Sequence, residues 1–159
     1  MGIVNVTPDS FSDGGQFYHP EKAIIHAIQL INDGADIIDV GGESSRPGAT
    51  HVLLQEELER TIPVIQKIRQ TSPDTLISID TYKSEVAIEA IEAGANMIND
   101  ISGLTMDKTM PNIAADLGVP IVIMHMQGTP ANMQIKPRYK LSLIHISEPT
   151  RPRLISYAV

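Results

Sequence analysis

Two polar side chains that could hold an organic ring follow separate apolar runs of this sequence. Asp80 comes directly after Ser78-Ile79, and Asn99 comes directly after Met97-Ile98. A carboxylate accepts two N–H hydrogen bonds, and an amide offers both a donor and an acceptor. If the two runs are neighbouring strands, this pair suits a heterocycle with a guanidine-like edge. The alternative is that both side chains make buried structural hydrogen bonds.

A second group of residues suits an anion. The segment Gly41–Ala49 reads GGESSRPGA, and its small residues would let backbone N–H groups approach a ligand. The Ser45 hydroxyl can donate a hydrogen bond, and the planar guanidinium of Arg46 matches a phosphate or a carboxylate. Pro47 stiffens the segment and restricts where Arg46 points. The alternative is a structural ion pair between Arg46 and Glu43.

A third group lies in the segment Asn5–Gly15, which is rich in Pro, Asp, Ser and Gly and therefore predicts a long loop. The loop could close over a substrate, with Phe11 stacking on it and Asp13 offering a carboxylate. The alternative is a solvated loop with one half-buried Phe. His125 could be a base or a ligand, but a lone His is more often a satisfied polar residue, and we leave it out of the catalytic set.

Five short apolar runs predict strands that are buried on both faces. Four segments with helical spacing lie between them, so the pattern is βαβαβαβαβ. The second helix is expected to bury Leu54, Leu58, Ile62 and Ile65, and Pro63 should kink or restart it. The centres of the five strands are Ile3-Val4, Ile37-Ile38, Leu76-Ile77, Met97-Ile98 and Ile121–Ile123.

An internal repeat indicates that the strands are parallel. Residues Gly34–Asp39 read GADIID, residues Gly94–Asn99 read GANMIN, and Gly118–Val122 is a looser copy. Each copy begins with a glycine suited to the left-handed position that ends a helix, and then enters a strand. Strands joined by helical crossovers are parallel.

Two architectures fit this pattern, an open doubly wound sheet and a (β/α)8 TIM barrel. Barrel enzymes collect catalytic groups from several strand ends at one face, whereas an open sheet gathers them at one switch point. No G-x-G-x-x-G follows the first strand. We therefore expect an α/β fold, namely a barrel truncated to about its first five strands and four helices. Polar residues end all five strands: Asn5, Glu43, Asp80, Asn99-Asp100 and His125.

The composition excludes several classes of protein. The 159 residues are 42% hydrophobic, which is enough for one globular domain, and they include no Cys. A disulfide scaffold, a Cys-ligated metal and a cysteine nucleophile are thereby excluded. The net charge of −7 argues against nucleic-acid binding, which needs a basic patch. With no apolar run long enough for a membrane span and no signal peptide, we expect a cytoplasmic protein.

The last part of the chain differs from the rest. Residues 1–135 hold 7 Lys and Arg against 18 Asp and Glu, whereas residues 136–159 hold 5 against 1. The segment 141–151 continues neither periodicity and resembles the translation of a transposase adapter used in sequencing libraries. We expect residues 1–139 to form a partial barrel domain and residues 140–159 to be a non-native tail. A natural disordered terminus is the alternative.

Segments 1–15 (MGIVNVTPDSFSDGG) and 39–49 (DVGGESSRPGA) closely resemble the bacterial dihydropteroate synthase family. Segments 78–81, 98–100 and 124–128 continue the match, and the resemblance covers about residues 1–139. Members of this family are (β/α)8 barrels that join p-aminobenzoate to 6-hydroxymethyl-7,8-dihydropterin diphosphate. They release pyrophosphate and form dihydropteroate in folate synthesis. The resemblance therefore implies a pterin-binding transferase with these two small-molecule substrates.

The resemblance also implies roles for the residues at the strand ends. Asp80 and Asn99 hold the pterin ring, and we expect Asp80 to be catalytic. Ile101 and Met124 line the slot for the ring. Asn5 helps to bind the Mg²⁺ that sits on the diphosphate.

The two loops take the remaining roles that the resemblance implies. Ser45 and Arg46 lie around the diphosphate, Asp13 approaches it when the first loop closes, and Phe11 and Pro47 shape the p-aminobenzoate pocket. We expect Arg46 and Asp13 to be catalytic. In the implied SN1-like reaction, Mg²⁺ and cationic groups draw off pyrophosphate, and the aniline nitrogen attacks a pterin-stabilised carbocation. Catalysis is then electrostatic stabilisation and positioning.

The sequence also departs from the family. Ser45 stands where the family usually has Thr, and a short N-terminal hairpin is absent. The last three βα units, with a pterin-binding Asp and Lys and a late Arg–His pair, are missing. We therefore expect this chain alone to be inactive, and its full-length relatives to be homodimers. Two alternatives stay open: a non-catalytic half-barrel, and a pterin-dependent methyltransferase domain, which both loops disfavour because a methyl donor brings no diphosphate.

Overall fold

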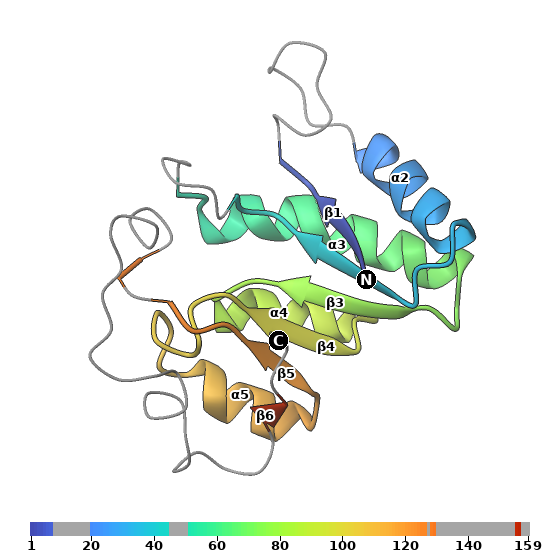
Figure 1. Ribbon diagram of the computed structural model, residues 1–159. Helices are drawn as coiled ribbons and strands as arrows, with labels where there is room; N and C mark the ends of the chain where they lie inside the picture. Colours follow the sequence, from blue (N-terminus) through green and yellow to red (C-terminus); the bar gives the residue numbers. More distant parts are fainter. Residues whose placement is uncertain (8–19, 45–50, 127, 130–154, 157–159) are drawn as a thin grey trace.

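The computed structural model describes residues 1–7, 20–44, 51–126, 128–129 and 155–156. Within these residues, parallel strands alternate with helices along the chain (Figure 1). The elements are β1 (Gly2–Asn5), α2 (Pro20–Asn32), β2 (Ile37–Gly41), α3 (Leu54–Thr71), β3 (Leu76–Asp80), α4 (Ser84–Glu92), β4 (Met97–Asp100), α5 (Met110–Leu117), β5 (Ile121–Ile123) and β6 (Ile155–Ser156).

The order of the strands distinguishes between the two expected architectures. The strands form one sheet in the order β1-β2-β3-β4-β5-β6, and every neighbouring pair is parallel. A doubly wound sheet reverses its strand order at a switch point, whereas a barrel adds each strand beside the previous one. The observed order is therefore that of a partial barrel, and the predicted first five strands and four helices are confirmed.

The short strand β6 belongs to the segment that we expected to be a non-native tail. Its two residues pair in parallel with Ile121 and Val122 of β5. The rest of residues 140–159 lies outside the described part of the chain. The domain boundary at residue 139 and the origin of the tail stay predictions.

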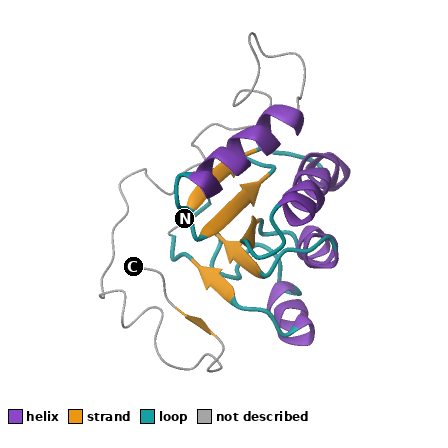
Figure 2. Cartoon of the chain, turned by 90° about the vertical axis from the view of Figure 1, so that its right-hand side faces the viewer, coloured by secondary structure: helices purple, strands orange, loops and turns teal. Residues whose placement is uncertain are grey.

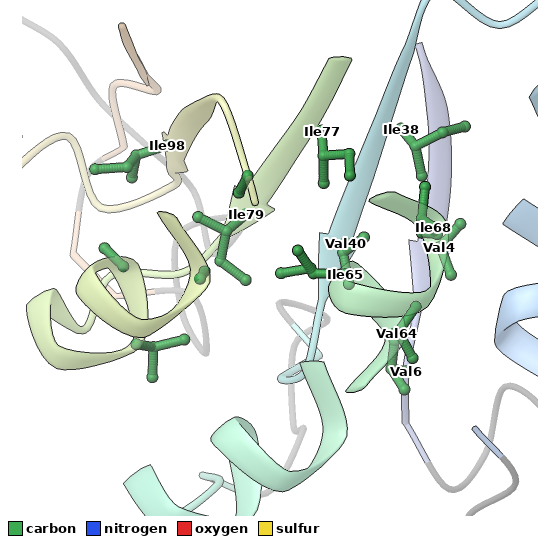
Figure 3. Close-up of a cluster of buried hydrophobic side chains, with 14 of the residues drawn as sticks. Val4, Val6, Ile38, Val40, Val64, Ile65, Ile68, Ile77, Ile79 and Ile98 are labelled. Carbon is green, nitrogen blue, oxygen red and sulfur yellow. The ribbon is translucent and has the colours of Figure 1, made fainter. Parts of the chain in front are cut away.

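The hydrophobic core lies between the sheet and the helices, which gather on one side of the strands (Figure 2). Alternate residues of a strand point to opposite faces of a sheet, so each strand sends every second side chain into this core. Burying one aliphatic side chain of this kind contributes about 1.5–3 kcal/mol. The buried residues include Val4, Val6, Ile38, Val40, Ile77, Ile79 and Ile98 from the strands and their flanks, and Val64, Ile65 and Ile68 from α3 (Figure 3).

Helix α3 contains Pro63 but continues through it without a break in the helix. The expectation that Pro63 restarts the helix was therefore wrong. Pro63 lies on the exposed side of α3, where water can hydrogen-bond the carbonyl group of Glu59 that a proline leaves without its helical donor.

In the described part of the chain, neither α3 nor a shorter helix is long and apolar enough to cross a membrane.

The expected apolar stripe of α3 is confirmed only at its C-terminal end. Ile65 is buried, but Leu54 is exposed, and Leu58 and Ile62 are half-buried. The helix is rotated relative to the expectation, so its N-terminal half turns polar side chains toward the sheet. These buried polar residues are Glu57, Arg60 and Thr61.

The three glycines of the sequence repeat adopt the predicted backbone conformation. Gly34, Gly94 and Gly118 have φ angles of 95°, 115° and 65°. Such positive values are strained for residues with a side chain. Each glycine ends a helix and turns the chain into the next strand, which confirms the reading of the repeat.

The loop before α5 caps the start of α4, the helix that follows Asp80. The carboxylate of Asp107 accepts hydrogen bonds from the backbone N–H groups of Ser84 and Thr109, each at 2.8 Å. Partial burial alone would raise the pKa of Asp107, but hydrogen bonds from Ser84 and Thr109 lower it to about 2. Asp107 therefore supplies the N-terminal cap that α4 lacks locally, since Lys83 makes no side-chain cap.

We expect Asp107→Asn to lower the free energy of unfolding by about 1 kcal/mol near neutral pH, because both carboxylate oxygens accept a backbone N–H and an amide has only one acceptor oxygen. A lowered pKa stabilises the fold above the unfolded value of about 4, and this contribution disappears as the pH falls through about 2. The difference between the two proteins in urea unfolding should therefore shrink as the solution is acidified across that range. Asp74→Asn, in an exposed turn, is the control. An equal loss in both variants would contradict the cap.

Candidate active site

The carboxyl ends of β1 to β4 place four residues in one layer. The strand register aligns Asn5 with Gly41, Gly41 with Asp80, and Asp80 with Asn99. The residues that alternate with them face the helices, so this layer lies on the inner face of the sheet, away from the helices. Asp80 and Asn99 are thus neighbours, as the sequence predicted.

Asp80 lies in an acidic environment. Burial is the largest cause that raises its pKa, followed by the negative charges of Asp39, Glu57, Asp100 and Glu43, and together they bring it to about 7. A carboxyl group with this pKa exchanges between an acceptor-only anion and a neutral donor near physiological pH. A ligand edge rich in N–H groups would stabilise the anion, so the site is suited to such an edge.

A second layer lies one step deeper on the inner face. Asp39 pairs in register with Ser78, and both side chains are buried. The Asn99 amide donates a hydrogen bond from Nδ2 to Oδ2 of Asp39 at 3.1 Å. Burial raises the pKa of Asp39, and the nearby Ser78 hydroxyl and Asn99 amide offset this only in part. Sequence reasoning used Asp39 only as part of a motif and did not place it in the site.

A buried ion cluster lies beside Asp80. Lys83 forms ion pairs with Glu43 and Glu57, whose side chains are only 15% and 1% exposed. Tyr82 donates its hydroxyl to the Glu43 carboxylate at 3.0 Å, and Lys83 Nζ lies 4.7 Å from the centre of the Tyr82 ring. Burial alone would lower the pKa of Lys83, but the two carboxylates raise it. One lysine therefore joins the end of β2, helix α3 and the start of α4.

Helix α3 packs directly against the chain that follows β2. A Cβ atom at Gly42 would lie 2.8 Å from Cγ2 of Thr61 and 2.9 Å from Cγ of Glu57, which is too close for a side chain. Arg60 donates a hydrogen bond from Nη1 to the carbonyl oxygen of Gly42 at 2.8 Å. The second glycine of the GGESS motif is thus required by helix packing, and the motif holds Glu57 close to Glu43.

A pocket opens at this end of the sheet between the carboxyl ends of β2, β3 and β4. Ile101, which the resemblance places in the ring slot, shares the pocket with Asp80. Asn99 lies beside Asp80 on the inner face but is not part of the pocket lining. The lining residues are Glu43, Ser44, Glu57, Asp80, Thr81, Tyr82 and Ile101.

Two further expected site residues lie at the same end of the sheet. Asn5 is exposed where β1 ends. Met124 follows β5 and is 37% exposed, and its backbone N–H donates to the carbonyl oxygen of Asp100 at 3.1 Å. The Asp100 carboxylate accepts hydrogen bonds from the N–H groups of Ser102 at 2.7 Å and Leu104 at 2.8 Å. Asp100 therefore shapes the loop that carries Ile101.

The structure does not describe the two loops. Their expected site residues lie outside the described part of the chain, and the roles that the resemblance implies for them stay predictions, as does the alternative ion pair between Arg46 and Glu43. These residues are Phe11, Asp13, Ser45, Arg46 and Pro47.

Sequence reasoning missed the polar face of α3 and its lysine partner. A usable signal was present, because Glu57, Arg60 and Thr61 stand at helical spacing in phase with the buried Val64 and Ile68. Polar residues that continue an apolar stripe toward the active end of a barrel indicate a buried polar contact. The partner Lys83 carried no local signal.

Comparison with known protein families gives a match over almost the whole chain. A family model described as "Pterin binding enzyme" matches residues 1–151. The chain belongs to the pterin-binding enzyme family. Asp80 and Asn99 therefore lie side by side in a member of a family that is defined by pterin binding.

The chain has many curated relatives in addition to the family match. It is 54% identical over 134 residues to the dihydropteroate synthase of Synechocystis sp., covering 84% of this chain and 46% of the relative. It is 56% identical over 125 residues to the dihydropteroate synthase of Bacillus subtilis, covering 79% of this chain and 44% of the relative. The chain thus spans less than half the length of these relatives.

Solved structures agree with the fold of this chain. The Yersinia pestis dihydropteroate synthase, solved with a sulfonamide drug complex, superposes with a TM-score of 0.81 at 46% identity, covering 92% of this chain and 52% of that one. The Xanthomonas albilineans dihydropteroate synthase with 4-aminobenzoic acid superposes with a TM-score of 0.77 at 48% identity, covering 87% and 48%. These matches confirm the partial barrel.

We expect Asp80→Asn to stabilise the folded chain at about pH 8 but not at about pH 4. The raised pKa means that the folded state is destabilised as the pH rises from the unfolded value of about 4 through about 7, because the buried anion faces other carboxylates. The melting temperature should rise by about 5 °C at the higher pH. Asp116→Asn, on the exposed side of α5, is the control. A pH-independent effect would contradict the shifted pKa.

We expect Lys83→Met to lower the free energy of unfolding by roughly 3–5 kcal/mol, because it leaves the buried Glu57 carboxylate without its counter-ion. Denaturant unfolding measures the loss, and the double variant Lys83→Met with Glu57→Gln should recover part of it. Lys67→Met changes an exposed lysine of α3 and should cost less than about 0.5 kcal/mol. Similar losses in both lysine variants would show that the cluster contributes nothing.

Proposed function

We propose that this chain carries the pterin-binding part of a dihydropteroate synthase. This enzyme condenses 6-hydroxymethyl-7,8-dihydropterin diphosphate with p-aminobenzoate to 7,8-dihydropteroate and pyrophosphate in folate biosynthesis. The observation that carries the proposal is the pair of Asp80 and Asn99 at adjacent strand ends, in a chain about half identical to known dihydropteroate synthases.

The chemistry of a pterin ring fits the environment of Asp80. The ring presents a 2-amino group next to a ring N–H, and an ionised carboxylate can accept hydrogen bonds from both. The surrounding acidic groups raise the pKa of Asp80 to about 7, so a donor-rich or cationic ring relieves an unfavourable charge there. Ile101, in the same pocket, supplies an apolar surface for the ring, and Met124 lies at the same end of the sheet.

The diphosphate and Mg²⁺ would lie above Asn5. Mg²⁺ prefers oxygen ligands and keeps several of its waters, so one or two protein oxygens together with substrate phosphates are sufficient. Asn5 is exposed in the same layer as Asp80 and carries an amide oxygen, which fits this requirement. When bound, Mg²⁺ would neutralise negative charge on the diphosphate. Asp13, Ser45 and Arg46 keep the roles that the resemblance implies.

The proposed reaction needs no covalent intermediate on the protein. The bond between the pterin methylene carbon and the diphosphate oxygen breaks, and the aniline nitrogen of p-aminobenzoate forms a bond to that carbon and then loses a proton. Positive charge develops on the pterin as the diphosphate leaves. Asp80, with Asp39 and Glu43 close by, supplies the fixed negative charge that favours such a cation. Phe11 and Pro47 keep their implied place at the p-aminobenzoate pocket.

A chimera tests the function. Residues 1–126 would replace the matched segment of the Bacillus subtilis dihydropteroate synthase, which supplies the remainder of the barrel. We expect the chimera to form dihydropteroate and Asp80→Asn to lower its kcat/KM by about 100-fold, the loss of a charged hydrogen bond. The matched control is Asp116→Asn.

The 159-residue chain should bind 6-hydroxymethylpterin without turnover, because it spans less than half of its relatives. A folded chimera without synthase activity, or turnover by the chain alone, would contradict the proposal.

We propose in addition that the protein acts in the cytoplasm and that the complete enzyme is a homodimer. The absence of Cys from all 159 residues is compatible with a reducing compartment. The homodimer rests on the resemblance alone. Sedimentation of the chimera measures its oligomeric state.

A further inference from the structure

Asp39 and Asn99 meet across strand β3 on the inner face of the sheet. They belong to β2 and β4, the two strands that flank β3, and Asn99 Nδ2 donates to Oδ2 of Asp39 at 3.1 Å. Asp39 is only 4% exposed, so water does not compete freely for this contact. Asn99 is also the register neighbour of Asp80.

The burial of the Asp39 carboxylate is costly. Its second oxygen, Oδ1, is buried and has no hydrogen-bond partner in the described part of the chain, and the same holds for the hydroxyl of Ser78 beside it. Buried polar groups are normally paired, and an unpaired one lowers stability. The nearby Ser78 hydroxyl and the Asn99 amide offset the burial of this carboxylate only in part. The bond from Asn99 is thus a hydrogen bond of good length to a carboxylate that is otherwise poorly satisfied.

The two ends of an amide group differ in their hydrogen bonding. Its nitrogen carries two hydrogens, and its oxygen only accepts. A carboxylate is an acceptor, so Asp39 favours the orientation in which Nδ2 of Asn99 faces it. The second Nδ2 hydrogen and Oδ1 then lie in a set order along the free edge of the amide. Turning the amide over would exchange donor and acceptor along that edge.

We propose that Asp39 is a positioning residue that holds the Asn99 amide in one orientation and so sets the order of donor and acceptor that the site presents to its ring ligand. This inference rests on the proposed function, since it concerns how the same site selects a pterin. In this orientation the free edge of Asn99 is complementary to a ring edge with an acceptor nitrogen beside an amino group. A ring with the opposite order, an N–H beside a carbonyl group, meets the wrong partners on Asn99.

Two ligands of nearly equal size separate these cases. 6-Hydroxymethylpterin carries a ring nitrogen acceptor next to its 2-amino group, whereas 6-hydroxymethyllumazine carries a ring N–H next to a 2-carbonyl group. Asp39→Asn keeps the size of the side chain but can donate as well as accept, so it no longer selects one orientation of Asn99. Asp80 is unchanged in this variant and retains its own preference for donors.

Calorimetric titration of the 159-residue chain measures the ratio of the two affinities. We expect the unmodified chain to prefer the pterin, and Asp39→Asn to reduce that preference at least about fivefold. Ser78→Ala changes a buried polar residue of the same layer without removing the carboxylate, and it should keep the original ratio. An unchanged ratio in Asp39→Asn, or an equal reduction in Ser78→Ala, would overturn the proposal.

A second measurement needs neither ligand nor variant. Proton exchange of the Asn99 side-chain NH₂ group with water, followed by NMR, should be slower than that of Asn32, which is exposed at the end of α2. Equal exchange rates would overturn the proposal even if Asp39→Asn fails to fold. If the unmodified chain binds neither ligand, the proposed function fails for this chain, and the exchange rates still decide whether Asp39 holds Asn99.

Discussion

The alternation of side chains along parallel strands is the constraint on which the core and the site both depend. Val4, Val40, Ile79 and Ile98 point to the helices and form the core. Their neighbours must then point to the inner face, and the register of β1 to β4 brings those neighbours into one layer. A shift of one residue in any strand would move its polar group into the core.

Asp80, the one acidic residue of this layer, lies among several other carboxylates. Lys83 forms ion pairs with Glu43 and Glu57, but the described part of the chain provides no ion pair for Asp80 or Asp39. Burial raises the pKa values of both groups, and the charges of the neighbouring carboxylates raise that of Asp80 further. This arrangement lowers stability and favours a ligand with a donor-rich or cationic edge, which is the property that the proposed chemistry requires.

Much of the fold was predictable because its signals are local. The β-branched runs and the glycines at 34, 94 and 118 marked the strands and the turns into them. The errors arose where packing outweighs local preference. Pro63 stays inside α3 because the buried Val64 and Ile68 hold the helix against the sheet, and Glu57 is buried because Gly42 lets the helix approach closely.

The sequence by itself determined which residues end each strand, and therefore that Asp80 and Asn99 would be neighbours, because alternation and helical crossovers are properties of short segments. Only the tertiary structure decided the partners of the buried charges. Lys83 lies 40 residues from Glu43 and 26 from Glu57, and Asn99 lies 60 from Asp39. The contact of Lys83 with Glu57 depends on how α3 is rotated about its axis, and the contact of Asn99 with Asp39 depends on β3 lying between β2 and β4. No local sequence pattern specifies either arrangement.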